Sequence, residues 1–148
     1  MDSNELFARW MDVRSGLYEA LVKIKDEQLD FRPREGLWSI RETAVHIAGT
    51  EDGWLRYYTL NRWHENPPNA KDYPTIDSIK SLLSENHDAT IRQFAHNVDA
   101  LLHQNCTLPW GGHVSMEWAV WHVLEHEIHH RGEIYLMLGL LGIEAPDV

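Results

Sequence analysis

Hydrophobic residues recur at three- and four-residue intervals in four stretches of the chain, and this spacing predicts four amphipathic helices. Ser39 and Glu42 form a capping-box pattern at the start of the second stretch, and Ser115 can cap the fourth. No segment alternates with the period of two that would predict a strand. The predicted helices span about residues 4–26, 39–61, 75–103 and 115 to the 139–146 region.

The segments between these helices contain residues that interrupt helical structure. Pro33 and Gly36 follow the first helix, and a linker of about a dozen residues with Pro67, Pro68 and Pro74 follows the second. This linker is long enough to span a bundle, so the second and third helices can run parallel. We therefore expect one all-α domain over residues 1–148, a four-helix bundle.

Charge and composition exclude several classes of protein. Thirteen Lys and Arg against 23 Asp and Glu leave a net charge of −10, which repels nucleic acid. No window approaches the ~18 to 20 apolar residues of a membrane span, and the acidic N-terminus does not resemble a secretory signal. We therefore expect a cytoplasmic protein. The single Cys106 cannot form an internal disulfide, and no motif around it indicates more than a structural thiol.

Ten histidines stand in this short chain, and the spacing of two of them indicates a metal site. His126 and His130 are one helical turn apart, and the apolar residues on their face direct both rings into the bundle. His46 on the second helix is a candidate third ligand, and three imidazoles would leave a coordination position open for water or substrate. A hydrogen-bonded core histidine is the simpler alternative. His122 and His129 leave open which two histidines of the fourth helix bind.

The remaining histidines and several tryptophans have simpler interpretations. The other histidines fall in linkers, helix ends or polar stretches, where we expect surface residues: His64, His87, His96, His103 and His113. Four tryptophans at helical spacing are more typical of a core or an interface than of a cofactor site: Trp10, Trp54, Trp118 and Trp121.

Residues 126–130 also match the HExxH pattern of zinc proteases, in which Glu127 would be the general base. Only eighteen residues follow His130 and no strand is predicted, so the third ligand and the substrate-aligning edge of such enzymes are lacking. We instead expect Glu127 to pair with Arg131 on the outer surface. The protease is the least favoured interpretation.

The chain resembles the DinB/YfiT-like family of metalloenzymes in two segments, FRPREGLWSIRETAVHIAGTEDGWL and WHVLEHEIHHRGEIYLMLGLLGIEAP. The shared marks are a WSI helix start, a histidine in the second helix and an HxxxHRG segment in the fourth. The resemblance implies a bundle with up-down-down-up topology and a divalent metal, zinc or nickel, bound by His46, His126 and His130. His122 and His129 would then neighbour the ligands or be structural.

Several members of this family transfer or isomerise groups with a low-molecular-weight thiol such as bacillithiol, mycothiol or glutathione. A bound divalent cation lowers the pKa of a coordinated thiol or water, which explains the chemistry. The resemblance thus implies a metal-dependent enzyme that delivers a thiol, or water, to a small electrophile. Trp54, Tyr57 and Trp118 are candidates for its pocket wall. The alternative is a non-catalytic stress-response bundle that is stabilised by a metal or binds a small molecule.

The fourth helix carries a second apolar arc, opposite the face of the histidine pair. A helix that is apolar on two faces has two neighbours, so we predict a homodimer. The competing explanation places both arcs inside one bundle, and a monomeric mass in solution would favour it. The arc consists of Trp121, Leu124, Ile128, Tyr135 and Leu136.

Overall fold

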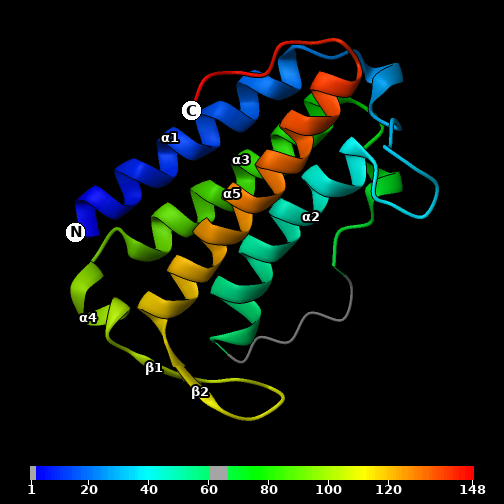
Figure 1. Ribbon diagram of the computed structural model, residues 1–148. Helices are drawn as coiled ribbons and strands as arrows, with labels where there is room; N and C mark the ends of the chain where they lie inside the picture. The colour runs from blue at the N-terminus through cyan, green and yellow to red at the C-terminus, as the bar shows by residue number, and fades with distance from the viewer. Residues whose placement is uncertain (1–2, 61–66) are drawn as a thin grey trace.

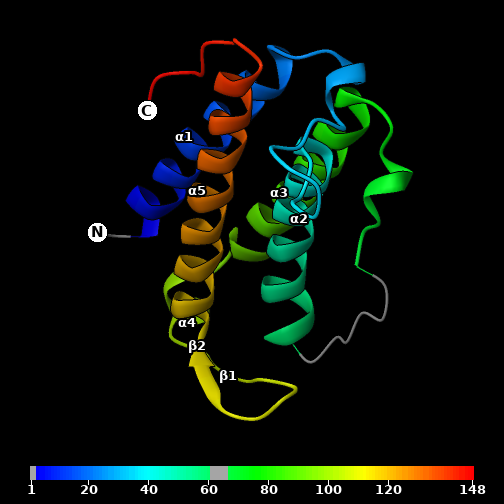
Figure 2. The ribbon, with the colours of Figure 1, turned by 45° about the vertical axis from the view of Figure 1, so that its right-hand side comes forward.

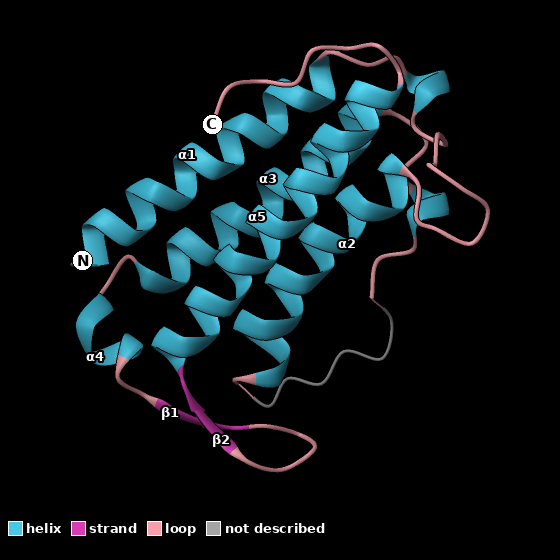
Figure 3. Cartoon of the chain, in the orientation of Figure 1, coloured by secondary structure: helices cyan, strands magenta, loops and turns pink. Residues whose placement is uncertain are grey.

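The computed structural model describes residues 3–60 and 67–148, in which four long helices form a bundle (Figures 1 and 3). Helices α1 (Ser3–Val22) and α5 (Met116–Leu140) run in one direction, while α2 (Ile40–Asp52) and α3 (Ile76–Phe94) run in the other (Figure 2). The predicted up-down-down-up bundle is confirmed. The shorter elements are η1 (Asp26–Gln28), η2 (Gly53–Tyr58), η3 (Ala70–Asp72), α4 (Val98–Leu102), β1 (Asn105–Thr107) and β2 (His113–Ser115).

Two apolar clusters hold the helices in this arrangement. One joins the ends of α1 and α5 to the starts of α2 and α3, and it includes Leu21, Ile40, Ile79 and Leu138. The other joins the opposite ends of α1, α3 and α5 to η2, which follows α2, and it includes Trp10, Leu55, Phe94 and Met116. Because burying each large apolar side chain stabilises the fold by about 1.5–3 kcal/mol, these pairings determine the direction of every helix.

The predicted helix starts are confirmed. Ser39 accepts a hydrogen bond from the Glu42 amide at 3.2 Å, and the Glu42 carboxylate accepts one from the Ser39 amide at 2.7 Å. Ser115 caps α5 by accepting from the Trp118 amide at 3.1 Å. Each cap satisfies amide groups that the first helical turn leaves without partners.

The second and third predicted helices are less regular than their spacing indicates. α2 continues as the π-helical turn η2, and the predicted end of this helix, Asn61, lies outside the described residues. The predicted continuous helix over 75–103 is wrong, because α3 ends at Phe94 and α4 begins after Asn97. Asn97 has a left-handed φ of 57°, a conformation that ends a helix and that Asn tolerates better than most residues.

Two short strands contradict the prediction of a strand-free chain. β1 and β2 form an antiparallel hairpin with Cys106 opposite Val114, and each has three residues, too few to show alternation. The loop between them turns through Gly111 and Gly112, whose φ values of 93° and 90° favour glycine. Burial raises the pKa of the Cys106 thiol, in keeping with a structural role.

A buried charge cluster links all four long helices. Arg14 of α1 donates to Glu127 of α5 at 2.6 Å and to Glu51 of α2 at 2.9 Å. His87 of α3 donates to Glu51 at 3.0 Å. Burial alone would raise the pKa of Glu51, but the His87 hydrogen bond and the charge of Arg14 outweigh it and lower the pKa to about 2. The cluster therefore holds the Glu51 carboxylate ionised inside the core.

This cluster corrects two predictions. His87, expected at the surface, is 5% exposed, and Glu127, expected on the outside with Arg131, is 1% exposed. Glu127 also accepts from the Trp10 indole at 2.7 Å, whereas Arg131 donates to the Val13 carbonyl. The physical reason is Arg14, since a buried guanidinium requires carboxylate partners from the helices around it.

Acid should weaken the fold through Glu51. A carboxyl group whose pKa is about 2 when folded, against an ordinary 4.5, contributes stability that is complete above the ordinary value. This contribution is lost as the pH falls toward the folded value. We expect urea unfolding to show a steeper loss of stability over that interval for the wild type than for Glu51→Gln. Equal slopes would contradict the assignment.

The exposed apolar surface of α5 bears on the predicted homodimer. Leu124 is buried in its own bundle, whereas Ile128 and Leu136 are 42% and 63% exposed. Part of the predicted arc is thus available to a second copy, and the homodimer stays a prediction. Within residues 3–60 and 67–148, no helix combines the length and apolar character of a membrane span.

Candidate metal centre

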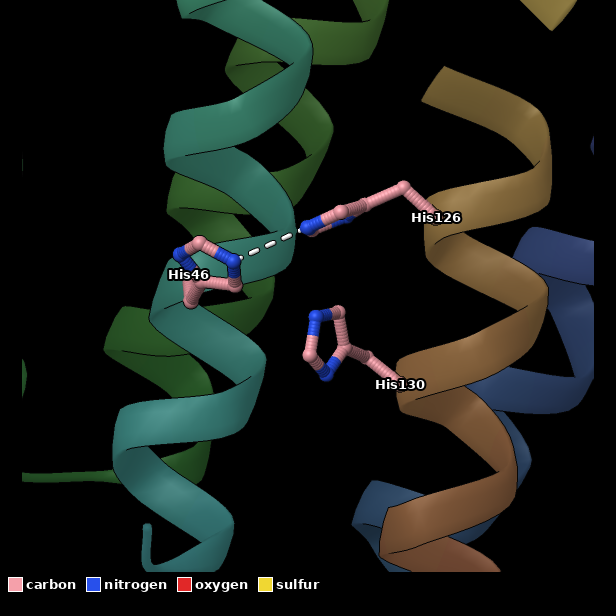
Figure 4. Close-up of side chains that lie close together, drawn as sticks. All are labelled: His46, His126 and His130. Carbon is pink, nitrogen blue, oxygen red and sulfur yellow. Dashed lines mark hydrogen bonds between the residues drawn. The ribbon is translucent and has the colours of Figure 1, made fainter. Parts of the chain in front are cut away.

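Three histidines from α2 and α5 converge between the two helices (Figure 4). Their candidate ligand nitrogens all lie within 4.8 Å of one another. The Nε2 atoms of His46 and His126 are 2.9 Å apart, and the His130 ring lies 4.9 Å and 4.3 Å from these two rings between centroids. The structure therefore brings together the three residues that the family resemblance implies as ligands.

The protonation of these rings suits a cation. Burial, together with the nearby His130, lowers the pKa of His46, and the same causes lower that of His126 to about 3. Both rings are neutral at pH 7, and a neutral imidazole offers the lone pair that binds a metal. Among the described residues, Nδ1 of His126 is buried without a hydrogen-bond partner. Three imidazoles whose candidate ligand nitrogens lie within 4.8 Å of one another fit a divalent transition-metal ion.

Glu133 orients the third ring. Nδ1 of His130 donates to the Glu133 carboxylate at 2.6 Å, which leaves Nε2 of His130 directed toward the other two histidines (Figure 4). Carboxylates commonly orient metal-binding histidines in this way. The sequence analysis missed Glu133, although its position three residues after His130 is a usable signal. His129 is 69% exposed and lies 3.3 Å from Glu133, outside the triad.

We expect Glu133→Ala to weaken metal affinity about 10–100-fold, because His130 would lose the partner that selects its tautomer and ring orientation. Competition with a chromophoric chelator measures the affinity. Glu125→Ala, which changes an exposed carboxylate on the same helix, is the matched control and should leave the affinity unchanged. Equal affinities for the two variants would contradict the role of Glu133.

A cavity of about 610 Å³ lies beside the histidines, and His46 and His126 form part of its wall. Trp54, one of the candidates for the pocket wall, lines this cavity. Tyr57 does not, because the lining side chain from the π-helical turn is its neighbour Tyr58. Trp118 is not a lining residue, but it stacks on the lining ring of His122 with centroids 4.9 Å apart.

Trp38 is a second residue that the sequence analysis missed. Its indole lies 4.5 Å from the His46 ring and 5.8 Å from the His130 ring between centroids. It comes directly before the Ser39 cap, so the start of α2 places it against the histidines. Trp38 also lines the cavity, and its ring covers one side of the triad.

The protease interpretation fails at Glu127. Its carboxylate is held by Arg14 and Trp10 in the core and is 1% exposed, so it does not reach the cavity. His126 and His130 of the HExxH pattern do belong to the triad. The pattern thus contributes two candidate ligands without a general base.

These features define an up-down-down-up four-helix bundle with three histidines that face one another from α2 and α5. The chain belongs to the DinB family, whose model matches residues 1–148.

Solved structures share this fold. A DinB-like protein of Bacillus cereus superimposes with a TM-score of 0.81 at 19% identity, covering 99% of this chain and 97% of that one. YfiT of Bacillus subtilis, described as a probable metal-dependent hydrolase with an unusual four-helix bundle topology, gives 0.69 at 20% identity, with 97% and 91% covered. At these identities the similarity demonstrates a common fold.

A similar sequence is that of YizA of Bacillus subtilis, which is 26% identical over 101 residues. The matched region covers 67% of this chain and spans 62% of the length of YizA.

Proposed function

We propose that this DinB family protein is a metal-dependent enzyme in which His46, His126 and His130 hold a divalent cation, zinc or nickel. The observation that carries the proposal is the convergence of three candidate ligand nitrogens within 4.8 Å beside a cavity of about 610 Å³. The bound cation would lower the pKa of a thiol or water. The nucleophile would then react with a small electrophile in the cavity.

The nucleophile comes from a second reactant in this proposal. Cys106 is 2% exposed in the hairpin and does not line the cavity, so the protein's own thiol is not available. A low-molecular-weight thiol such as bacillithiol, mycothiol or glutathione would supply the sulfur. The cytoplasm, where we expect the protein, keeps such thiols reduced. YfiT is described as a probable metal-dependent hydrolase, and if the present protein is also a hydrolase, water would be the nucleophile.

A second cavity supports transfer between two organic molecules. It has a volume of about 410 Å³ and is bordered by His130 and Glu133, with Trp38 shared between the two cavities. Two cavities that share Trp38 therefore adjoin the triad. A hydrolase needs room for one organic substrate, whereas group transfer from a thiol needs room for two.

The chain's own side chains would position these reactants. Glu133 orients the His130 ring, and Trp38 covers His46 and His130 and limits access of bulk water. Thr50 has its hydroxyl 3.3 Å from Nε2 of His126 and lines the larger cavity, where it can hydrogen-bond to a reactant.

The test begins with metal analysis of protein purified without chelator. The holo protein is then incubated with each thiol and with chlorodinitrobenzene as the electrophile, and free thiol is followed with time. We expect metal-dependent loss of thiol that His46→Ala abolishes and His129→Ala retains, because His129 lies outside the triad.

The other outcomes discriminate between the remaining functions. Metal-dependent hydrolysis of a nitrophenyl ester without thiol consumption would show that the nucleophile is water and not a thiol. If stoichiometric metal raises the melting temperature but neither thiol consumption nor ester hydrolysis is detected, the enzymatic proposal is overturned in favour of a metal-stabilised bundle.

A further inference from the structure

The larger cavity has two chemically different ends. Antiparallel helices α2 and α5 face each other along it, so that His46 lies opposite His126 and Trp54 lies opposite His122. The Trp54 and His122 rings are 4.7 Å apart, and His122 is 6.5 Å from His126 between centroids. A histidine end and an aromatic end therefore adjoin within one cavity.

The aromatic end of the cavity is formed by Trp54 and Tyr58, which are supported by Trp110. Trp54 and Tyr58 line the cavity with ring centroids 5.4 Å apart at an interplanar angle of 81°. Trp110, from the loop of the hairpin, lies 5.8 Å from Trp54 and 5.0 Å from Tyr58. These edge-to-face contacts fix the orientation of the two lining rings.

The exposure of this region is unusual for a structural cluster. Trp110 is 59% exposed and Trp118, which packs on Trp54 at 5.4 Å, is 46% exposed. Large aromatic side chains that gather at a surface with much of their area in water mark binding sites more often than core. The position of this group beside the cavity indicates that the binding site is the cavity itself.

The charges at the cavity narrow the class of ligand. Among the described residues that line it, Glu42 is the one carboxylate, and none is Lys or Arg. The Glu42 carboxylate already accepts from the Ser39 amide and pairs with Arg32 at 3.2 Å. The lining residues that the structure describes thus offer no Lys or Arg to the phosphate or carboxylate of an anionic ligand.

We infer that the larger cavity binds an uncharged organic substrate with an aromatic group, which stacks on Trp54 and Tyr58 while its reactive atom lies at the histidine end. This inference deepens the proposed function by naming the class of electrophile, and it rests on that function for the reaction. A volume of about 610 Å³ is within the usual range of roughly 300–1,000 Å³ for small-molecule sites.

The test compares three probes on the zinc-loaded protein by ligand-observed NMR titration. The probes are para-nitroanisole, which is aromatic and uncharged, para-nitrobenzenesulfonate, which is aromatic and anionic, and cyclohexyl methyl ether, which is uncharged and not aromatic. We expect the anisole to bind about twofold to tenfold more tightly than the ether, since stacking adds to apolar burial. The sulfonate is compared with the anisole on zinc-free protein, where no metal cation attracts it, and it should bind about tenfold more weakly because its charge would be buried without a partner.

Two variants locate the binding. Trp54→Leu keeps an apolar side chain but removes the ring, and should lower anisole affinity about twofold to tenfold while leaving the ether nearly unchanged. Trp121→Leu is the matched control, because Trp121 packs on the same apolar cluster as Trp54 but does not line this cavity. If the circular dichroism spectrum of Trp54→Leu shows that it no longer folds into helices, Tyr58→Leu is tested in its place.

Equal binding of anisole and sulfonate to the zinc-free protein, or equal effects of the Trp54 and Trp121 substitutions, would overturn the inference. Zinc content is measured on the same samples and separates the two proposals. Protein that holds zinc without a preference for the anisole contradicts only the substrate class. Protein that prefers the anisole but holds no zinc contradicts only the metal-dependent function.

Discussion

Replacing His126 with alanine is expected to abolish stoichiometric metal binding. His126 contacts both of the other candidate ligands, with its Nε2 atom 2.9 Å from that of His46 and its ring 4.3 Å from that of His130 between centroids. Loss of a group that only orients a ligand costs about 10–100-fold in affinity, so loss of a ligand should cost more than about 100-fold. Metal content after dialysis against a weak chelator measures the effect.

His129→Ala is the matched control for this prediction. The substitution removes an imidazole from the same helix. Because the His129 side chain is 69% exposed, its loss should leave metal content and affinity unchanged. Because a metal that binds only the folded state stabilises it, added zinc should also raise the melting temperature of the control and not of His126→Ala. A full equivalent of metal retained by His126→Ala would refute the site.

The largest expected effect on stability is that of Arg14→Met. Arg14 is 1% exposed and donates to Glu51 and Glu127, which are 0% and 1% exposed. Methionine would leave two carboxylates in the core without their cation, and removal of one partner from a buried pair costs about 3–5 kcal/mol. Urea unfolding followed by circular dichroism gives the free energy of unfolding.

Arg9→Ala provides the comparison for Arg14→Met. Arg9 lies on the same helix but pairs with Asp12 at 4.0 Å in solvent, where the two side chains are 57% and 73% exposed. Exposed pairs contribute little, so the expected change is within about 1 kcal/mol. A loss of similar size for the two arginines would show that the buried cluster does not hold the helices together.

Much of the fold could be predicted because its signals are local. Apolar positions at helical spacing identified the four long helices, and Ser39 and Ser115 marked the starts of α2 and α5. The signals failed where a few residues interrupt a periodic stretch. The left-handed Asn97 separates α3 from α4, and the strands around Cys106 and Val114 are too short to alternate.

The sequence by itself determined that His126 and His130 share one helical face and point into the bundle, since a helix has a constant rotation per residue. It could not determine what other helices bring to meet a given face. Only the tertiary structure placed His46 against that pair. The pairing of Glu127 with Arg14 was likewise decided by the tertiary structure, because the partner of this buried charge is more than a hundred residues away in the sequence.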